Sequence, residues 1–430
     1  MSQSNKKRYT IAIIAILAVY ALLLGVFTIV NYDHLITTVD TESYTCVAEN
    51  MLAGKGFADS SGEADGYRTP GYPLFLMAVF ALGGNLTAVV VVQLLLAVAT
   101  LYLVYRICLI MNVRPVYSLI CAGLYLLDIS LYIYTGFAIS DSFFYFVLVL
   151  SAYFLARFIK NKSFWSFLIF VAVLNFALAT RPILMYYNGL VCLFVLVLCI
   201  LKKLPLKALF ATVLIFAVVF GGWSFRNYCR TGVFEMSNVR NHNLMYFDSA
   251  VLRSEVEGIA VSEARARFEQ EYEERYADRD LDNMSLSERR VLEGEIGNEY
   301  IKAHFGAYLV QNIKGLFNTM FGPNREFLNT VMGSTPVTRA VELLYMAYLG
   351  IVYVLYVLGW ILNLKKANWL DLFILTVSGY CAAASASLGY ARFRVAFFGL
   401  LLVGAFVLWK DSDILERIKG LFKGKKKKVS

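Results

Sequence analysis

Long apolar runs separated by short polar segments dominate the chain. A helix of about 20 apolar residues crosses a bilayer, and runs close to this length recur along most of the sequence. They predict ten membrane spans, at about residues 9–30, 87–107, 116–134, 142–159, 164–180, 184–201, 207–225, 338–363, 369–389 and 393–410. The pattern therefore predicts an all-α, polytopic membrane protein.

One apolar stretch, residues 71–84, is short for a span, and the charges decide how to interpret it. If it does not cross, the chain makes ten crossings and both termini lie on the same side. The basic connections between spans then share one face with the N-terminal cluster Lys6–Arg8 and the lysine-rich tail. These connections contain Arg106 and Arg114; Arg157, Lys160 and Lys162; Lys202, Lys203 and Lys207; and Lys365 and Lys366. Basic loops mark the cytoplasmic face, so residues 71–84 are predicted to form an interfacial or re-entrant helix.

Composition agrees with this class of protein. Hydrophobic residues make up 59% of the 430 residues and charged residues 17%, against about 45–50% and 25% in soluble domains. An ordinary soluble enzyme and a disordered scaffold are therefore excluded. The net charge of +9 is not interpreted as nucleic-acid binding, because the basic residues flank apolar spans. The first apolar run is long enough to span and lacks a small-residue cleavage site, so it is not interpreted as a signal peptide.

Two segments are predicted to lie outside the cytoplasm, at residues 31–70 and 226–337. Within the second, residues 254–300 have helical spacing, and Ser285 has the chemistry of an N-cap for another helix. Residues 312–321 are amphipathic and are predicted to return along the membrane surface. The expected organisation is a catalytic transmembrane module over 1–225, an extracytoplasmic loop domain over 226–337, C-terminal helices over 338–410 and a basic cytoplasmic tail over 411–430 on anionic lipid.

Unusual polar residues collect in the connections on the predicted outer face. They are Asp40, Glu42, Arg68, Asp141, Arg181, Arg226, Arg392 and Arg394. Asp40 and Asp141 each have two interpretations, as helix caps or as functional carboxylates. Arg392 and Arg394 are harder to explain structurally, because positive charge is disfavoured on this face. Two guanidiniums there indicate an anion such as a lipid phosphate, and Arg68 is a candidate to join them.

Several other chemistries lack support. His34, His242 and His304 are isolated, and there is no HExxH motif, Walker A loop or dinucleotide fingerprint. We expect that the protein requires no cofactor. Binding of a divalent cation by Asp or Glu side chains stays open as an alternative, but nothing in the sequence supports it. Of the seven cysteines, only Cys46 and Cys229 lie outside the spans, and we expect them to be unpaired.

The set of motifs on the outer face resembles the GT-C superfamily of membrane glycosyltransferases. The nearest branch is similar to the bacterial relatives of protein O-mannosyltransferases and of the aminoarabinose–lipid A transferases. The motifs are the acidic pair Asp40 and Glu42, Arg68-Thr-Pro-Gly-Tyr-Pro-Leu-Phe, Ile139-Ser140-Asp141, Arg181-Pro182, Trp223-Ser-Phe-Arg226-Asn and a late Arg392-Phe-Arg394. The resemblance covers about residues 9–230 and weakens through 231–337.

The resemblance implies an inverting transferase that takes a sugar from a polyprenyl-phosphate donor at the outer membrane face. Asp40 matches the base of related families, and Asp141 matches a second acidic position near the acceptor. Arg392 or Arg394 matches a basic residue near the carrier phosphate, with Arg68 as a further donor-phosphate candidate. The acidic pair is not adjacent, which leaves the role of Glu42 open among the catalytic candidates. Further substrate-binding candidates are Tyr44, Tyr72, Arg181, Arg226 and Tyr390.

The expected location is the cell membrane, with cytoplasmic termini and an extracytoplasmic active site. The expected partners are the donor lipid, the bilayer and a glycan, lipid or protein acceptor, and no nucleic acid is expected. One alternative is a transporter or lipid flippase, for which Asp128 is the main intramembrane carboxylate. A second alternative is a non-catalytic assembly protein that binds a partner through residues 226–337.

Overall fold

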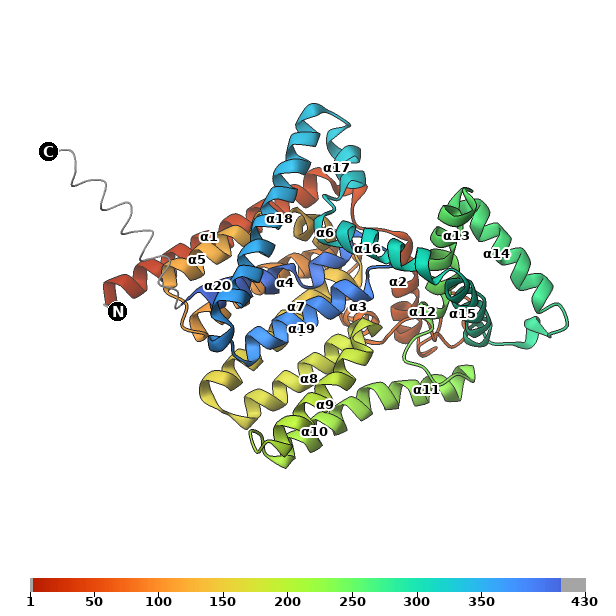
Figure 1. Cartoon of the computed structure of the whole chain (residues 1–430), viewed down its shortest axis with the longest axis horizontal. Helices are drawn as coiled ribbons and strands as arrows, with labels where there is room; N and C mark the ends of the chain where they lie inside the picture. The colour runs from red at the N-terminus through yellow and green to blue at the C-terminus, as the bar shows by residue number, and fades with distance from the viewer. Residues whose placement is uncertain (1–2, 411–430) are drawn as a thin grey trace.

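Helices form the regular structure of the computed structural model, which describes residues 3–410 (Figure 1). The prediction of an all-α membrane protein is confirmed. The helices of the main bundle are α1 (Gln3–Val30), α4 (Leu86–Ile110), α5 (Pro115–Tyr125), α6 (Ile129–Gly136), α7 (Ser140–Asn161), α8 (Phe164–Thr180), α9 (Met185–Ile200), α10 (Leu206–Phe216), α11 (Gly222–Thr231), α18 (Pro336–Asn363), α19 (Trp369–Ala384) and α20 (Phe398–Trp409).

The remaining helices belong to the two predicted outer segments, except α3, which lies in the stretch 71–84 predicted as an interfacial or re-entrant helix. They are α2 (Val39–Leu52), α3 (Gly71–Ala81), α12 (Val239–Asn243), α13 (Ala250–Glu257), α14 (Val261–Arg275), α15 (Leu286–Ala303), α16 (Phe305–Phe321) and α17 (Arg325–Met332). In Figure 1 the helices α12 to α15 lie at the end of the molecule away from the start of α1. The basic tail predicted over 411–430 lies outside the described residues.

Six helical stretches are long and apolar enough to cross a membrane, and the bent pair α5–α6 makes a seventh. The shorter apolar helices are α3, α8, α19 and α20. Each predicted span thus has a helix or a helix pair. The stretch predicted as one span at 116–134 is not a single straight helix, because α5 and α6 are bent by 59° relative to each other. Asp128 lies at the break and accepts a hydrogen bond from the Ser130 N–H at 3.1 Å, so it caps α6.

The last span is also shorter than predicted. The chain forms a 3₁₀ segment, η7 (Ala391–Ala396), before α20 starts at Phe398. Helix α7 lies in the middle of the bundle and packs against α4, α8 and α19, with 67% of its most apolar stretch buried. The start of α7 and η7 therefore lie within a packed framework.

The outer loop domain has a small core of its own, centred on Met245, Phe268 and Ile296. The helical spacing predicted over 254–300 corresponds to the end of α13, the whole of α14 and most of α15. Helix α13 ends at Glu257, and its C-cap is Gly258, whose φ of 68° is a left-handed conformation that glycine tolerates. The predicted N-cap is confirmed: Ser285 and Glu288 form a capping box.

Helix α16 contains the predicted amphipathic segment 312–321. Leu309, Ile313 and Phe317 follow one another at four-residue spacing and are exposed, so they form an uncovered apolar face. This is consistent with a helix that lies on a membrane surface. The prediction that Cys46 and Cys229 are unpaired is confirmed, because both are free.

The stability of the loop domain is expected to fall with rising pH because of Asp248. This residue lies in η4 (Leu244–Ser249) and is 8% exposed. Burial raises the pKa of its carboxyl from 3.8 to about 7, so its contribution is fully present below 3.8 and is lost as the pH rises through 7. We expect a loss of roughly 2–4 kcal/mol by pH 9.

The substitution Asp248→Asn is expected to remove that loss. Thermal unfolding at pH 4 and pH 9 measures it, because these values lie close to and above the pH range over which the loss occurs, with Asp278→Asn as the control because Asp278 is exposed. Equal pH dependence of the unfolding temperature in wild type and Asp248→Asn would contradict the expectation.

Candidate active site

Five charged side chains form one continuous chain of alternating sign. In order they are Arg68, Asp40, Arg392, Asp141 and Arg181. They come from four separate parts of the sequence, and Asp40 and Arg392 are 352 positions apart. The fold therefore brings together five of the residues that the sequence placed on the outer face.

Asp40 lies in the first turn of α2. The N-cap of this helix is Thr38, whose capping box with Thr41 satisfies the helix end, so the interpretation of Asp40 as the cap is wrong. Its two carboxylate oxygens accept from Arg68 at 2.9 Å and from Arg392 at 2.8 Å. Burial opposes ionisation, but the guanidiniums of Arg392 and Arg68 outweigh it and hold the pKa of Asp40 well below its usual value.

Asp141 lies in the first turn of α7, whose N-cap is Ile139 without a side-chain cap. The cap interpretation is therefore wrong here as well. The carboxylate accepts from Arg181 and accepts twice from Arg392, at 2.9 and 2.7 Å. The Asp141 side chain is only 3% exposed, whereas that of Asp40 is 32% exposed. Of the two carboxylates, Asp40 is the one that a substrate can reach.

Arg392 joins the two carboxylates, and Arg68 forms one end of the chain. Arg68 also donates to the Ser43 hydroxyl at 2.9 Å and lies 4.0 Å from the centre of the Tyr44 ring. Three guanidiniums face two carboxylates, so the chain has a formal charge of +1. This excess, in guanidiniums that match oxyanions well, favours an anion such as a phosphate.

Tyr44 and Tyr72 are buried packing residues, and the Tyr44 ring contacts Arg68 at one end of this chain. The Tyr44 hydroxyl is 3.0 Å from that of Ser140, which ties α2 to the start of α7. Tyr72 donates to Gln93 at 2.8 Å, and the two tyrosine rings meet edge to face at 4.9 Å. Their burial supports a role in positioning α2.

Four other predicted residues lie outside the chain. Arg394 is fully buried and donates to the carbonyls of Thr319 and Gly322, both at 2.9 Å. Its prediction as a phosphate ligand is therefore wrong, because the guanidinium is used inside the fold. Arg226 donates to two backbone carbonyls of the first outer segment. Glu42 and Tyr390 are exposed.

Asp128, the residue that the transporter alternative uses, is 1% exposed. It accepts from the Ser130 N–H and from the Tyr345 hydroxyl. Arg394 donates to the same Tyr345 hydroxyl at 3.2 Å. These hydrogen bonds give the buried Asp128 carboxylate a structural role, because they link α6, α18 and η7.

Sequence reasoning missed two residues that position Arg68. Ser43 lies three residues after Asp40 on α2, and this spacing places both on one helix face. Asp65 accepts from the backbone N–H groups of Tyr67 and Arg68, at 2.6 and 3.2 Å. An Asp three residues before an Arg in a Gly- and Pro-rich segment is a turn signal that could have found it.

No group of three His, Cys, Asp or Glu side chains that could hold a metal ion occurs in the part of the chain that the structure describes. The two site carboxylates face guanidiniums. The arrangement has the residues for taking a proton at Asp40 and for binding an oxyanion at Arg392 and Arg68.

The fold has solved counterparts. The chain is similar to the archaeal oligosaccharyltransferase AglB from Archaeoglobus fulgidus, solved with an inhibitory peptide and a dolichol-phosphate, with a TM-score of 0.52 and 13% identity over 98% of this chain and 52% of that one. The chain thus spans about half the length of AglB.

Two structures of ArnT from Cupriavidus metallidurans, one bound to undecaprenyl phosphate and one in the apo state, also match. Their TM-scores are 0.41 and 0.39, with identities of 13% and 14%. The matches cover 91% and 93% of this chain and 77% and 78% of the ArnT chains. No protein-family model matches the sequence, and no curated protein matches it.

Proposed function

We propose that this chain, whose fold is that of the GT-C membrane glycosyltransferases, moves a sugar from a polyprenyl-phosphate donor to an acceptor hydroxyl. The single observation that carries the proposal is the alternating chain of Arg68, Asp40, Arg392, Asp141 and Arg181. In this chain the reachable carboxylate of Asp40 lies between two guanidiniums. A carboxylate can act as the base, and guanidiniums can stabilise the charge on a departing phosphate.

The proposed reaction is a direct displacement. The acceptor oxygen attacks the anomeric carbon of the donor, Asp40 takes the acceptor proton, and the bond from that carbon to the phosphate oxygen breaks. The polyprenyl phosphate leaves with the electron pair, and a single displacement inverts the anomeric centre. General-base catalysis of this kind contributes about 10²–10⁴-fold in rate.

Arg392 and Arg68 are assigned to the donor phosphate. Both already bind the Asp40 carboxylate, so an arriving phosphate competes with Asp40 for the same guanidiniums. The competition frees Asp40, whose pKa then rises toward the range of a useful base. Asp141, held by Arg181 and Arg392, is a positioning residue that keeps Arg392 in place.

The proposed orientation puts this site on the extracytoplasmic face and both termini in the cytoplasm. It rests on the basic loops, since Asp141 starts α7 and the basic residues Arg157 and Lys160 end it. Cysteine-accessibility labelling tests the orientation. Cysteines introduced into the exposed segment that follows α14 should react with impermeant reagents added outside intact cells.

The function is tested by transfer from purified donors. The full chain, reconstituted in lipid nanodiscs, is incubated with radiolabelled polyprenyl-phosphate sugars, while envelope glycans and glycoproteins are compared by mass spectrometry with and without the gene. We expect one glycan to disappear and its sugar to be released from the lipid in vitro. Identical glycans together with intact donors would contradict the proposal.

The pH profile provides a second test. The free-enzyme pKa of Asp40 lies well below its usual value, and a base must be ionised to act, so activity is lost as the pH falls through its pKa. We therefore expect the acid limb of kcat, which reports the donor complex, to lie at higher pH than the acid limb of kcat/KM, which reports the free enzyme. Acid limbs at the same pH would show that the donor does not displace the guanidiniums.

A further inference from the structure

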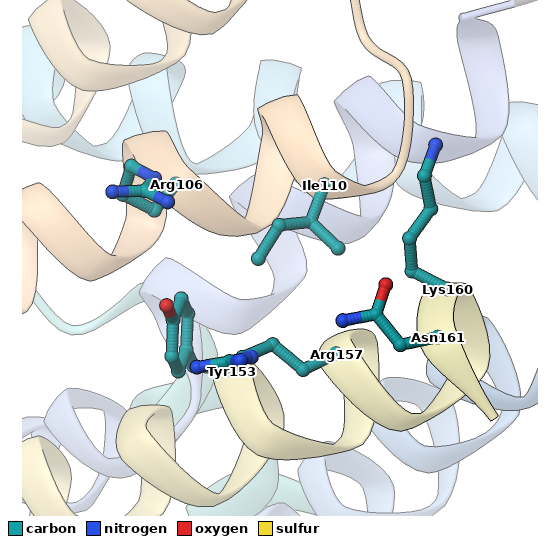
Figure 2. Close-up of a pocket in the computed structure, with 6 residues that line it drawn as sticks. All are labelled: Arg106, Ile110, Tyr153, Arg157, Lys160 and Asn161. Atoms are coloured by element: carbon teal, nitrogen blue, oxygen red, sulfur yellow. The ribbon is translucent and has the colours of Figure 1, made fainter. Parts of the chain in front are cut away.

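A basic hollow lies at the end of α7 opposite to the site. It has a volume of about 270 Å³ and is lined by Arg106, Ile110, Tyr153, Arg157, Lys160 and Asn161 (Figure 2). At about 1.5 Å per residue of helix, Arg157 is roughly 24 Å along α7 from Asp141. The hollow is therefore a separate feature on the other face of the bundle.

Three cations from two helices surround this space. Arg106 comes from α4, and Arg157 and Lys160 come from the last turns of α7. Two of them donate hydrogen bonds to neutral groups: Arg106 to the Tyr102 hydroxyl at 2.9 Å, and Lys160 to the Asn112 side chain at 2.7 Å. Within residues 3–410, none of the three forms a salt bridge with Asp or Glu. The hollow thus has a positive charge that suits an anion.

An apolar groove between α1 and α4 continues from the hollow. It has a volume of about 600 Å³ and shares Arg106 and Ile110 with the hollow. Its other walls include Ile13, Ile14 and Leu17 of α1. A small inorganic anion would use only the basic part, whereas an amphiphile with a phosphate head and a hydrocarbon chain would use both.

We infer that the hollow and the groove together bind one anionic phospholipid. The headgroup phosphate lies among Arg106, Arg157 and Lys160, and an acyl chain follows the groove beside α1. Basic pockets between membrane helices on the cytoplasmic side are suited to such headgroups. The inference does not depend on the proposed transferase activity.

The tail is a weaker candidate for the same space. Residues 411–430 contain seven Lys or Arg and three Asp or Glu, a formal charge of +4. Like charges repel, so the tail is electrostatically mismatched to three uncompensated cations. A lipid phosphate has the complementary charge.

The headgroup half of the inference is tested with the full chain in phosphatidylcholine nanodiscs that contain increasing amounts of a fluorescent phosphatidylglycerol. The double variant Arg157→Gln/Lys160→Gln is expected to bind this lipid about thirtyfold more weakly, or roughly fivefold for each charge removed near an anionic headgroup. The matched control is Lys202→Gln/Lys203→Gln, which removes two exposed lysines from a loop on the same predicted face. If both double variants lose equal affinity, or if neither loses any because the tail occupies the hollow, the inference is wrong.

The groove is tested with Leu17→Trp and with inorganic phosphate as a second probe. Filling the groove should weaken phosphatidylglycerol binding at least about tenfold, since a buried hydrocarbon chain contributes about 0.8 kcal/mol per CH₂, and should leave phosphate-induced thermal stabilisation unchanged. If Leu17→Trp leaves the affinity for phosphatidylglycerol unchanged, the hollow is a phosphate site that binds no lipid chain, and the inference is overturned. Unfolding temperatures within a few degrees of wild type establish that each variant is folded.

Discussion

Replacing Asp40 with asparagine is expected to lower the rate of sugar transfer by about 10²–10⁴-fold. Asparagine keeps the shape of the side chain and can still accept a hydrogen bond, but it cannot take the acceptor proton. The fold should persist, because Arg392 keeps Asp141 as a partner and Arg68 keeps the Ser43 hydroxyl. The measurement is the initial rate of transfer by purified protein with saturating donor, alongside its unfolding temperature.

Glu42→Gln is the matched control for this experiment. Glu42 lies two residues further along α2 and is exposed, and it takes no part in the chain of ion pairs around Asp40. We expect Glu42→Gln to transfer within about twofold of wild type, as surface substitutions usually leave a protein unperturbed. If Asp40→Asn is as active as wild type while Glu42→Gln is inactive, the base is Glu42 and the assignment made here is wrong.

Most of the fold could be predicted from the sequence because membrane insertion is decided locally. A long apolar run identifies a span wherever it lies, and the basic loops then fix a common orientation. The bend between α5 and α6 could not be predicted in this way. Asp128 lies inside an apolar run, and its role as the cap of α6 depends on Tyr345 and Arg394 from distant helices.

The site could be predicted only as a set of residues on one face. Asp40, Arg68, Asp141, Arg181 and Arg392 were identified because charged residues are costly beside apolar spans. The ion pairs between them could not be predicted from the sequence, since these pairs depend on how segments hundreds of residues apart pack together. The choice between Arg392 and Arg394 is the clearest case. The 3₁₀ turn of η7 directs Arg392 to the carboxylates and Arg394 to buried carbonyls.

The same geometry explains why Asp40 and Asp141 are not equivalent. Asp141 is buried between Arg181 and Arg392, so removing its charge would leave the Arg181 guanidinium without its carboxylate partner. Asp40 is more exposed, and both of its arginines have other acceptors, Ser43 for Arg68 and Asp141 for Arg392. The protein can therefore lose the Asp40 interaction transiently at little cost, which a phosphate-for-carboxylate exchange requires.

Arg392→Gln is expected to lower kcat by about 10²–10³-fold, because the guanidinium is assigned to the negative charge that develops on the leaving phosphate. Each carboxylate retains one guanidinium, Arg68 for Asp40 and Arg181 for Asp141, so the variant should fold. Arg392→Lys should recover part of the rate, since it restores the charge but cannot bridge both carboxylates.

A purely structural role for Arg392 would not move the pH profile, and this separates the two explanations. Arg392 is the stronger of the two charges that hold the pKa of Asp40 low. Its removal should therefore shift the acid limb of kcat/KM to higher pH, whereas Arg230→Gln, an exposed arginine at the end of α11, should shift nothing. An Arg392→Gln protein with wild-type kcat and an unmoved acid limb would show that neither the leaving phosphate nor the Asp40 carboxylate depends on this guanidinium during turnover.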